Sequence, residues 1–194
     1  MTTENNLITV YACGGAGVNI GRYVDQQEAE VNPNFAELKV VYIDTSRSNM
    51  RGRFDSKNVY IINQNKDEAI DGSGQVRREH AQDIIAQVPA ILHEYKPSIC
   101  NIVISSASGG SGSVLSPSIV SELLKRGENV IVMTIGCRDT EKYAQNTLDT
   151  LKSFEGVSKV TGRPVVLYYE ENTEEKPREK VDAHIRGTIA MIQA

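Results

Sequence analysis

The sequence predicts an α/β fold, a Rossmann-like parallel sheet of about six strands with helices on both faces. Its 194 residues, 40% of them hydrophobic, are enough for one globular domain with a sizeable core. Short apolar segments rich in β-branched residues alternate along the chain with segments of helical periodicity. This alternation is typical of a parallel sheet, in which a helix crosses over between neighbouring strands.

The predicted strands are nearly continuous in apolar character, as expected of strands that are covered on both faces. They are LITVYAC (7–13), LKVVYID (38–44), NVYII (58–62), ICNIVIS (99–105), NVIVMTI (129–135) and PVVLYYE (164–170). The predicted helices cover 18–30, 75–95, 114–126 and 140–154. The helix predicted over 75–95 carries one apolar stripe, and Pro89 is expected to kink it. The stripe comprises Ala81, Ile84, Ile85, Val88, Leu92 and Tyr95.

Composition and charge exclude several classes of protein. The formal net charge of −4 provides no basic field that would attract nucleic acid directly. The three cysteines, Cys13, Cys100 and Cys137, are too scattered for a metal or redox pair and indicate a reducing compartment. No apolar run approaches the roughly 20 residues that span a bilayer, and the N-terminus lacks a signal-peptide pattern. We therefore expect a cytoplasmic protein without a membrane partner.

Two glycine-rich segments each follow a predicted strand and lead into a predicted helix. The first, CGGAGVNIG, covers 13–21, and the second, SASGGSGSVLSP, covers 106–117. Such a segment presents backbone N–H groups that no Cβ blocks, and these groups bind anions at a helix N-terminus. Ser108, Ser111 and Ser113 add hydroxyl donors without bulk. Two such segments suggest one phosphate chain that is held from two sides.

Other phosphate-binding motifs fit less well. A P-loop is excluded because no Gly-Lys-Ser/Thr sequence follows either glycine segment. The dinucleotide fingerprint is broken, since Gly15 and Gly17 have the first spacing but the next glycine is Gly21. Asp44, at the end of the second predicted strand, would be the ribose acid of an NAD-binding domain. That alternative leaves the second glycine segment unexplained.

Five motifs in order along the chain resemble the tubulin/FtsZ family, and the TubZ-type plasmid and phage tubulin-like proteins most closely. They are GGAGVNIG, VVYIDTSRSNM, DGSGQVRREHAQDI (71–84), SASGGSGSVLSP and DTEKYAQNTLDTL (139–151). The resemblance runs from about residue 7 to about residue 190. It implies a tubulin-type GTPase domain that binds GTP or GDP with Mg²⁺.

The resemblance also assigns roles to individual residues of this sequence. The phosphates and the edge of the base would be lined by Gly14, Gly15, Ala16 and Asn19. The β- and γ-phosphates would be held by Gly109, Gly110, Ser111, Gly112 and Ser113. The terminal phosphate and its Mg²⁺ would lie near Asp71, Gly72 and Gly74, with Asp71 as the metal ligand. The ribose would be bound by Glu141, and the base by Asn172 together with Asp182 or His184.

The sequence departs from the family pattern at two places. Val114 stands where the signature has its last glycine, and a β-branched residue there is expected to narrow the loop. Residues 1–180 are expected to form the GTP-binding domain and 181–194 to begin the central helix, with the C-terminal domain and its catalytic acidic loop absent. We therefore assign no catalytic residue, and a non-catalytic nucleotide-binding or structural module stays an alternative.

The resemblance implies partners for the full-length protein as well. Such proteins associate with themselves into filaments, and hydrolysis is shared because one subunit grips the nucleotide while the next supplies an acid. The expected cargo is plasmid or phage DNA, reached through a DNA-binding adaptor protein.

Overall fold

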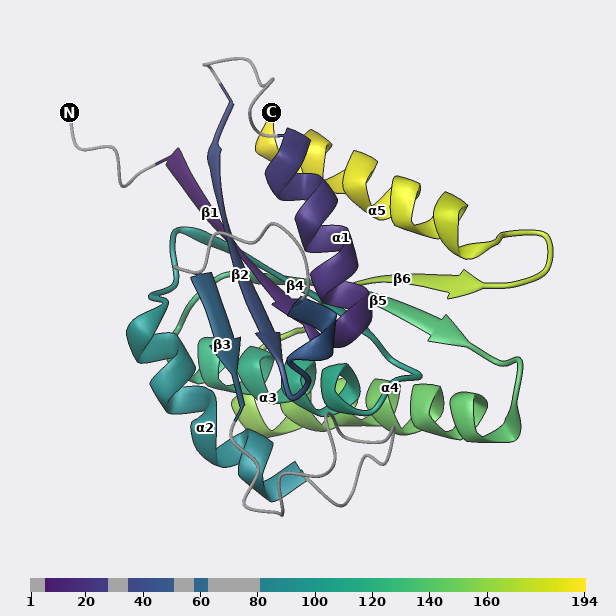
Figure 1. Cartoon of the computed structure of the whole chain (residues 1–194). Helices are drawn as coiled ribbons and strands as arrows, with labels where there is room; N and C mark the ends of the chain where they lie inside the picture. Colours follow the sequence, from purple (N-terminus) through teal and green to yellow (C-terminus); the bar gives the residue numbers. More distant parts are fainter. Residues whose placement is uncertain (1–5, 28–34, 51–57, 63–80) are drawn as a thin grey trace.

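The computed structural model describes residues 6–27, 35–50, 58–62 and 81–194, and within them six parallel strands form one sheet (Figure 1). The strands are β1 (Leu7–Cys13), β2 (Glu37–Asp44), β3 (Val59–Ile61), β4 (Cys100–Ser106), β5 (Val130–Cys137) and β6 (Val166–Asn172). Their order across the sheet is β3-β2-β1-β4-β5-β6. The predicted α/β fold class is thus confirmed.

Helices cover both faces of the sheet, as Figure 1 shows. The helices are α1 (Gly14–Gln27), α2 (Ala81–Glu94), α3 (Ser111–Lys125), α4 (Glu141–Thr161) and α5 (Arg178–Gln193), with a short 3₁₀ helix, η3 (Ser48–Met50). On one face, α2, α3 and α4 bury residues such as Ile91, Leu115 and Phe154 against the strands. On the other face, α1 and α5 bury residues such as Val18 and Ile185.

Two helices begin earlier than the sequence predicts. α1 starts at Gly14 rather than at 18, and α3 starts at Ser111 rather than at 114. The prediction was wrong because it relied on the low helix propensity of glycine and serine. In the structure, tertiary packing overrides that propensity and the first turn of each helix forms. Gly14, Gly15 and Gly17 therefore lie in the first turn of α1 and Gly112 lies in the first turn of α3, whereas Gly109 and Gly110 form the turn that precedes α3. At its other end, α4 continues to Thr161, where Gly162 takes the left-handed conformation at φ 66° and closes the helix.

Two predictions of burial were also wrong. β6 was expected to be covered on both faces, but Val166 is 55% exposed and Tyr169 is 37% exposed. The reason is its position at the edge of the sheet, where the helices cover it only in part. Ile85 was placed in the buried stripe of α2 but is 53% exposed, while Ile91 is fully buried in its stead.

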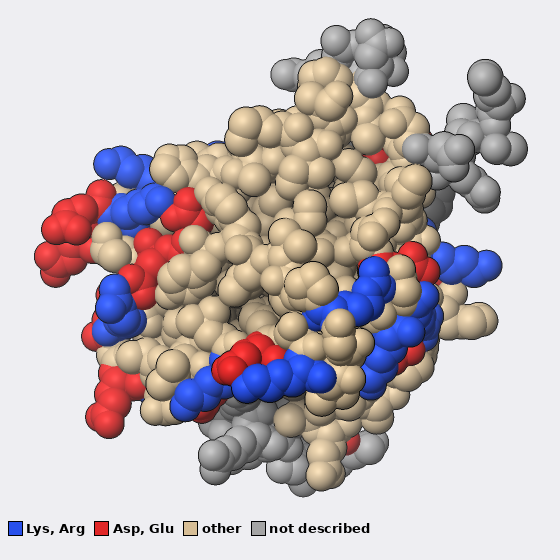
Figure 2. Space-filling model, turned by 180° about the vertical axis from the view of Figure 1, so that it is seen from behind, with Lys and Arg blue, Asp and Glu red and all other residues tan. Residues whose placement is uncertain are grey.

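Charged side chains of both signs are interspersed on the face shown in Figure 2. Lys and Arg side chains lie next to Asp and Glu side chains there, around a broad area of uncharged residues. In the described part of the chain, none of the helices combines the length and the apolar character that crossing a membrane requires.

Candidate functional site

The two glycine-rich turns meet where the direction of the chain connections reverses. β1 and β4 are neighbours in the sheet, yet β1 leads into α1 on one face and β4 leads into α3 on the other. In open parallel sheets, such a switch point leaves a crevice at the carboxyl ends of the strands, and ligands bind there. Both glycine segments singled out from the sequence therefore lie at the same crevice.

Close backbone approach explains three of the glycines, two at the contact between the turns and one where α1 crosses β4. A Cβ atom on Gly14 would lie 2.8 Å from the backbone nitrogen of Gly112, and one on Gly112 would lie 2.9 Å from the carbonyl oxygen of Cys13. A Cβ atom on Gly17 would lie 2.5 Å from the carbonyl oxygen of Ile104. Real Cβ atoms do not approach backbone atoms so closely, so packing alone requires glycine at these positions.

Gly109 is different, because the fold leaves room for a side chain there. Among the described residues, a Cβ atom on Gly109 would meet only the Ser106 side chain, at an ordinary contact distance of 3.7 Å. Gly110, which follows it, occupies the N-cap position of α3 and provides no side-chain cap. The first N–H groups of a helix have no partners within the helix, and they form the positive end of its dipole. The turn therefore offers anion-binding donors at a point that packing leaves open.

The serine hydroxyls of this segment are partly engaged. The Ser113 hydroxyl is buried and donates to the Gly110 carbonyl oxygen at 2.8 Å, so its proton is used within the turn. The Ser111 hydroxyl lies 2.9 Å from that of Thr45, which ties α3 to the turn after β2. Val114, expected to narrow the turn, lies in the first turn of α3, where its side chain is buried in the core on the side of α2.

Asp44 is a structural residue of the turn after β2. Its side chain is fully buried, and its carboxylate accepts from the backbone N–H of Thr45 at 2.7 Å and from the Asn49 amide at 2.7 Å. Burial raises the pKa of Asp44, and these hydrogen bonds oppose the shift. The ribose contact that an NAD-binding domain would need requires an open carboxylate, whereas this one is enclosed.

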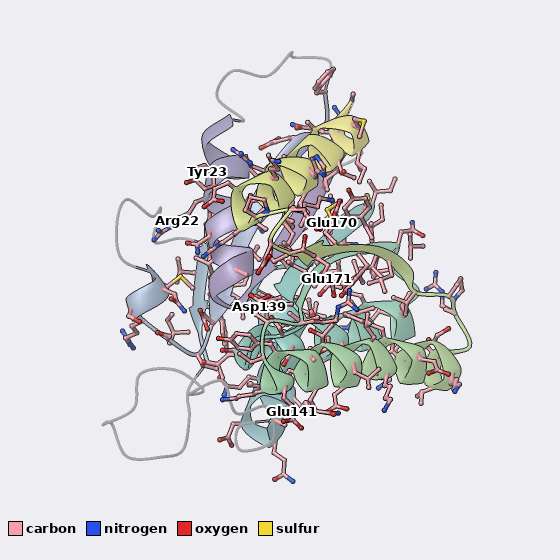
Figure 3. The ribbon with its side chains drawn as sticks, turned by 90° about the vertical axis from the view of Figure 1, so that its right-hand side faces the viewer. Arg22, Tyr23, Asp139, Glu141, Glu170 and Glu171 are labelled. Atoms are coloured by element: carbon pink, nitrogen blue, oxygen red, sulfur yellow. The ribbon has the colours of Figure 1, made fainter. Side chains whose placement is uncertain are left out.

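A pocket of about 460 Å³ lies between α1 and α5. It is lined by Asn19, Arg22 and Tyr23 of α1 and by Arg178, Glu179 and Asp182 of α5. Figure 3 shows Arg22 and Tyr23 on α1 beside α5. The structure thus brings together Asn19 and Asp182, two residues expected at the base, in a volume typical of ligand pockets.

Sequence reasoning missed four of the six lining residues. The sequence does contain a pattern that could have identified two of them. Asn19, Arg22 and Tyr23 have the i, i+3, i+4 spacing that places residues on one helix face. Arg178 and Asp182 likewise stand four residues apart, with 3.6 Å between the guanidinium Nε and a carboxylate oxygen.

The electrostatics of the pocket centre on Asp182. Its side chain is only 14% exposed, and burial raises its pKa, although Arg178 and Arg186 oppose the shift. The Arg186 guanidinium also lies 4.8 Å from the centroid of the Tyr23 ring. This cation–π contact connects the pocket wall on α1 with α5.

Asn172 carries an unusual feature, a buried acceptor with no partner. It ends β6, opposite Cys137 of β5, and its Oδ1 atom makes no hydrogen bond in the part of the chain that the structure describes. Buried polar atoms are nearly always paired, so an orphaned one calls for a specific explanation. A donor supplied by a ligand is one such explanation.

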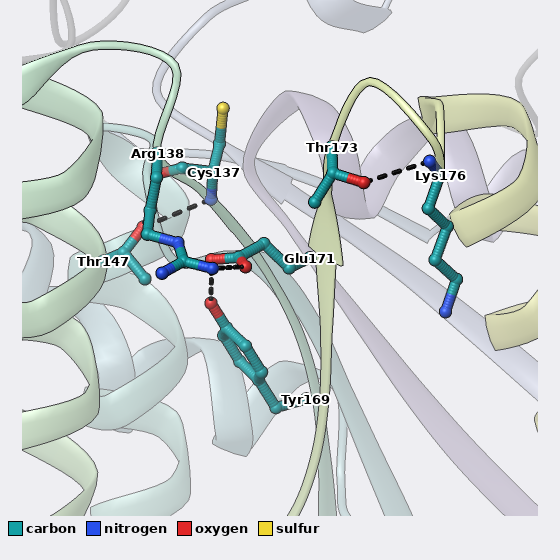
Figure 4. Close-up of polar contacts among 7 residues, drawn as sticks. All are labelled: Cys137, Arg138, Thr147, Tyr169, Glu171, Thr173 and Lys176. Carbon is teal, nitrogen blue, oxygen red and sulfur yellow. Dashed lines mark hydrogen bonds and ion pairs between the residues drawn. The ribbon is translucent and has the colours of Figure 1, made fainter.

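The end of β6 next to Asn172 is held by a polar bridge (Figure 4). Glu171 accepts from Arg138 at 2.5 Å and from the Tyr169 hydroxyl at 3.0 Å. The Tyr169 ring lies over Gly136, since a Cβ atom on that glycine would be 2.0 Å from the phenol oxygen. The turn into α5 is fixed by the backbone N–H of Lys176, which donates to the Thr173 hydroxyl at 3.0 Å.

Neighbouring side chains also engage Glu170, one residue earlier. It accepts from Lys176 and from the Tyr168 hydroxyl, and His184 lies 3.5 Å away. Burial would raise the pKa of Glu170, but hydrogen bonds from Lys176 and Tyr168 lower it overall. His184, the alternative base contact, is thus directed to Glu170.

Glu141 lies apart from the pocket between α1 and α5. It is the first residue of α4, exposed to solvent, and follows Thr140, whose hydroxyl accepts from the Tyr143 backbone N–H at 3.2 Å. In Figure 3, Asp139 lies between Glu171 and Glu141 along this edge of the molecule. The structure leaves Glu141 open but does not bring it to Asn19 and Asp182.

The predicted metal ligand cannot be placed. Asp71, with Gly72 and Gly74, lies outside the described residues. Within the described ranges, no three Asp, Glu, His or Cys side chains gather to hold a metal ion.

A parallel α/β domain with glycine-lined helix N-termini at its switch point has the architecture of the nucleotide-binding class. No family model matches the chain. A phage tubulin-like protein of Pseudomonas phage phiKZ is 36% identical over 183 residues, which cover 91% of this chain and 53% of the relative. A solved protofilament of TubZ from bacteriophage PhiKZ matches with a TM-score of 0.84 and 36% identity, over 95% of this chain and 55% of that one.

A structure of the phage tubulin PhuZ with GDP matches with a TM-score of 0.78 and 25% identity, over 95% of this chain and 55% of that one. The chain belongs to the tubulin/FtsZ family. It spans about half the length of the phage tubulin-like relatives that it matches.

Proposed function

We propose that this chain is the guanine-nucleotide-binding domain of a tubulin-like cytoskeletal GTPase that assembles into filaments. The observation that carries the proposal is the meeting of two glycine-lined helix N-termini, those of α1 and α3, at the switch point of the sheet. Two solved relatives support it, since one is a protofilament of TubZ and the other is the phage tubulin PhuZ with GDP.

The residues present fit a guanine base. Guanine offers two donors on one edge, N1–H and N2–H, which suit acceptor side chains. The Oδ1 atom of Asn172 is a buried acceptor without a donor among the described residues, and the carboxylate of Asp182 is a second acceptor, in the pocket beside α1. Both residues follow in chain order within one strand–turn–helix unit, β6 to α5.

The phosphates fit the two glycine turns. Neither glycine segment contains a lysine, so the backbone N–H groups of Gly109 to Ser113 and of Gly14 to Ala16 would supply the contacts. Mg²⁺ would neutralise phosphate charge, with Asp71 as the proposed ligand. Glu141 is the proposed ribose contact.

Hydrolysis and assembly are proposed for the whole protein. We propose that residues 1–180 form the nucleotide-binding domain, that 181–194 begin a central helix, and that a neighbouring subunit supplies the catalytic acid. Positioning of phage or plasmid DNA through a DNA-binding adaptor is part of the same proposal.

Calorimetry of the purified chain tests the nucleotide. GTP and GDP with Mg²⁺ should bind more tightly than ATP or NAD, because a wrong base leaves a buried group unpaired at a cost of about 1–3 kcal/mol. That cost corresponds to about 5- to 150-fold in affinity. Equal affinity for ATP, or preference for NAD, would overturn the proposal.

A further inference from the structure

Two side chains of α4 hold the turn between β4 and α3 from one side. The Asn146 amide donates to the Ser108 carbonyl oxygen at 3.1 Å, and the Thr150 hydroxyl donates to the Ala107 carbonyl oxygen at 2.8 Å. Thr150 shares its proton with the Asn146 carbonyl oxygen at 2.7 Å. The two residues are four apart, on one face of α4, and Thr150 is fully buried.

These contacts determine where the next two amide N–H groups point. Across a trans peptide, the carbonyl of one residue and the N–H of the next point in opposite directions. The carbonyls of Ala107 and Ser108 face α4, so the N–H groups of Ser108 and Gly109 face away from it. No cis peptide bond interrupts this relation within the described residues.

The direction away from α4 is the direction of the crevice. α4 follows β5, and β4 lies between β5 and β1 in the sheet. The turn after β4 therefore has α4 on one side and the turn between β1 and α1 on the other, where Gly112 touches Cys13. The Ser108 and Gly109 amides thus face the space between the two glycine turns.

We propose that Asn146 and Thr150 are positioning residues that preset the Ser108 and Gly109 amides as donors to nucleotide phosphates. The inference rests on the proposed function, because it requires that the crevice binds a nucleotide. A glycine-rich turn left unpinned would lose conformational freedom on binding, and pinning it beforehand removes that cost from the binding step. α4 thereby controls phosphate affinity without touching the phosphates.

Calorimetry with GDP and with guanosine separates this role from a general loss of structure. Thr150→Val keeps the shape but removes the hydroxyl, Thr150→Ser keeps the hydroxyl, and Asn146→Ala removes the amide. Thr161→Val is the matched control, because that hydroxyl on α4 donates to the Val157 carbonyl within its own helix at 2.8 Å. Circular dichroism confirms that each variant is folded.

We expect Thr150→Val and Asn146→Ala to weaken GDP binding about tenfold or more, the order of one hydrogen bond to a charged group. Guanosine affinity should stay unchanged, and Thr150→Ser and Thr161→Val should bind GDP like the parent. If both variants bind GDP like the parent, or if they lose guanosine affinity by the same factor as GDP affinity, the positioning role is wrong but the proposed function stands. A parent chain that binds neither GDP nor GTP would overturn the proposed function and this inference together.

Discussion

The substitution Gly109→Ala separates nucleotide binding from folding, because the fold has space for the added methyl group whereas the proposed phosphate contact does not. The new Cβ would lie 3.7 Å from the Ser106 side chain, an ordinary contact, and the backbone of Gly109 is not left-handed. The substitution should therefore leave the free energy of unfolding unchanged or raise it by about 0.4–1 kcal/mol through a stiffer unfolded chain. In the proposed site, its methyl group would stand beside the amide that donates to a phosphate oxygen.

The expected loss of GTP and GDP affinity follows from that contact. One hydrogen bond from a backbone N–H to a charged phosphate contributes about 1.5–3 kcal/mol, so affinity should fall about 10- to 150-fold. The assay pairs thermal denaturation with calorimetric titration of GDP. A variant that binds GDP as tightly as the parent would refute the phosphate role of this turn.

Two other glycines provide contrasting controls. Gly112→Ala would place a Cβ 2.9 Å from the Cys13 carbonyl oxygen, and such overpacking destabilises by about 1–3 kcal/mol. Gly156→Ala, within α4, would place its Cβ more than 4 Å from every described neighbour, so it should stabilise the helix without affecting nucleotide binding. Only Gly109→Ala should lose binding while it keeps stability.

Three further outcomes are expected. GDP affinity should fall on acidification, because Asp182 accepts from both guanine donors only while its carboxylate is ionised. Burial raises the pKa of Asp182, so the fall in a fluorescence titration should begin at a higher pH than for an exposed aspartate of pKa about 3.9. A flat pH profile would exclude Asp182 as a base contact. Asn172→Leu removes an unpaired buried acceptor, so thermal stability should hold while the preference for GTP over ATP falls; a preserved preference would argue against a base contact. The chain alone should release little phosphate from GTP, since Glu170, a candidate for the catalytic acid, is already paired with Lys176. Phosphate release that rises with protein concentration would contradict the proposal that a neighbouring subunit supplies the acid.

The fold was predictable because its signals are local. Buried parallel strands are continuous apolar runs, and the periodicity of the helices between them was readable in the chain. The first turns of α1 and α3 were not, because glycine is a poor helix former and only the contact between Gly14 and Gly112 shows why it stands there. That contact joins residues about a hundred positions apart, and no local pattern encodes it.

The candidate site was predictable only in part, for the same reason. Asn19 and Asp182 were expected at the base, and the structure brings both into one pocket. Tyr23 and Arg178 line the same pocket but resemble ordinary surface residues of amphipathic helices in the sequence. The hydrogen bonds of Asp44 to its own turn could not be predicted, because a carboxylate at a strand end looks the same in sequence whether it binds a ribose or orders its own turn.

The direct contact between the two glycine turns has a mechanical consequence. The turn after β1 continues into α1 on one side of the sheet, and the turn after β4 continues into α3 on the other. With no side chain between Gly14 and Gly112, neither turn can shift without displacing the other. A displacement of one turn, such as the loss of a bound phosphate would cause, would therefore move α1 and α3 together. The movement would pass from one face of the sheet to the other around its edge, without deforming the strands.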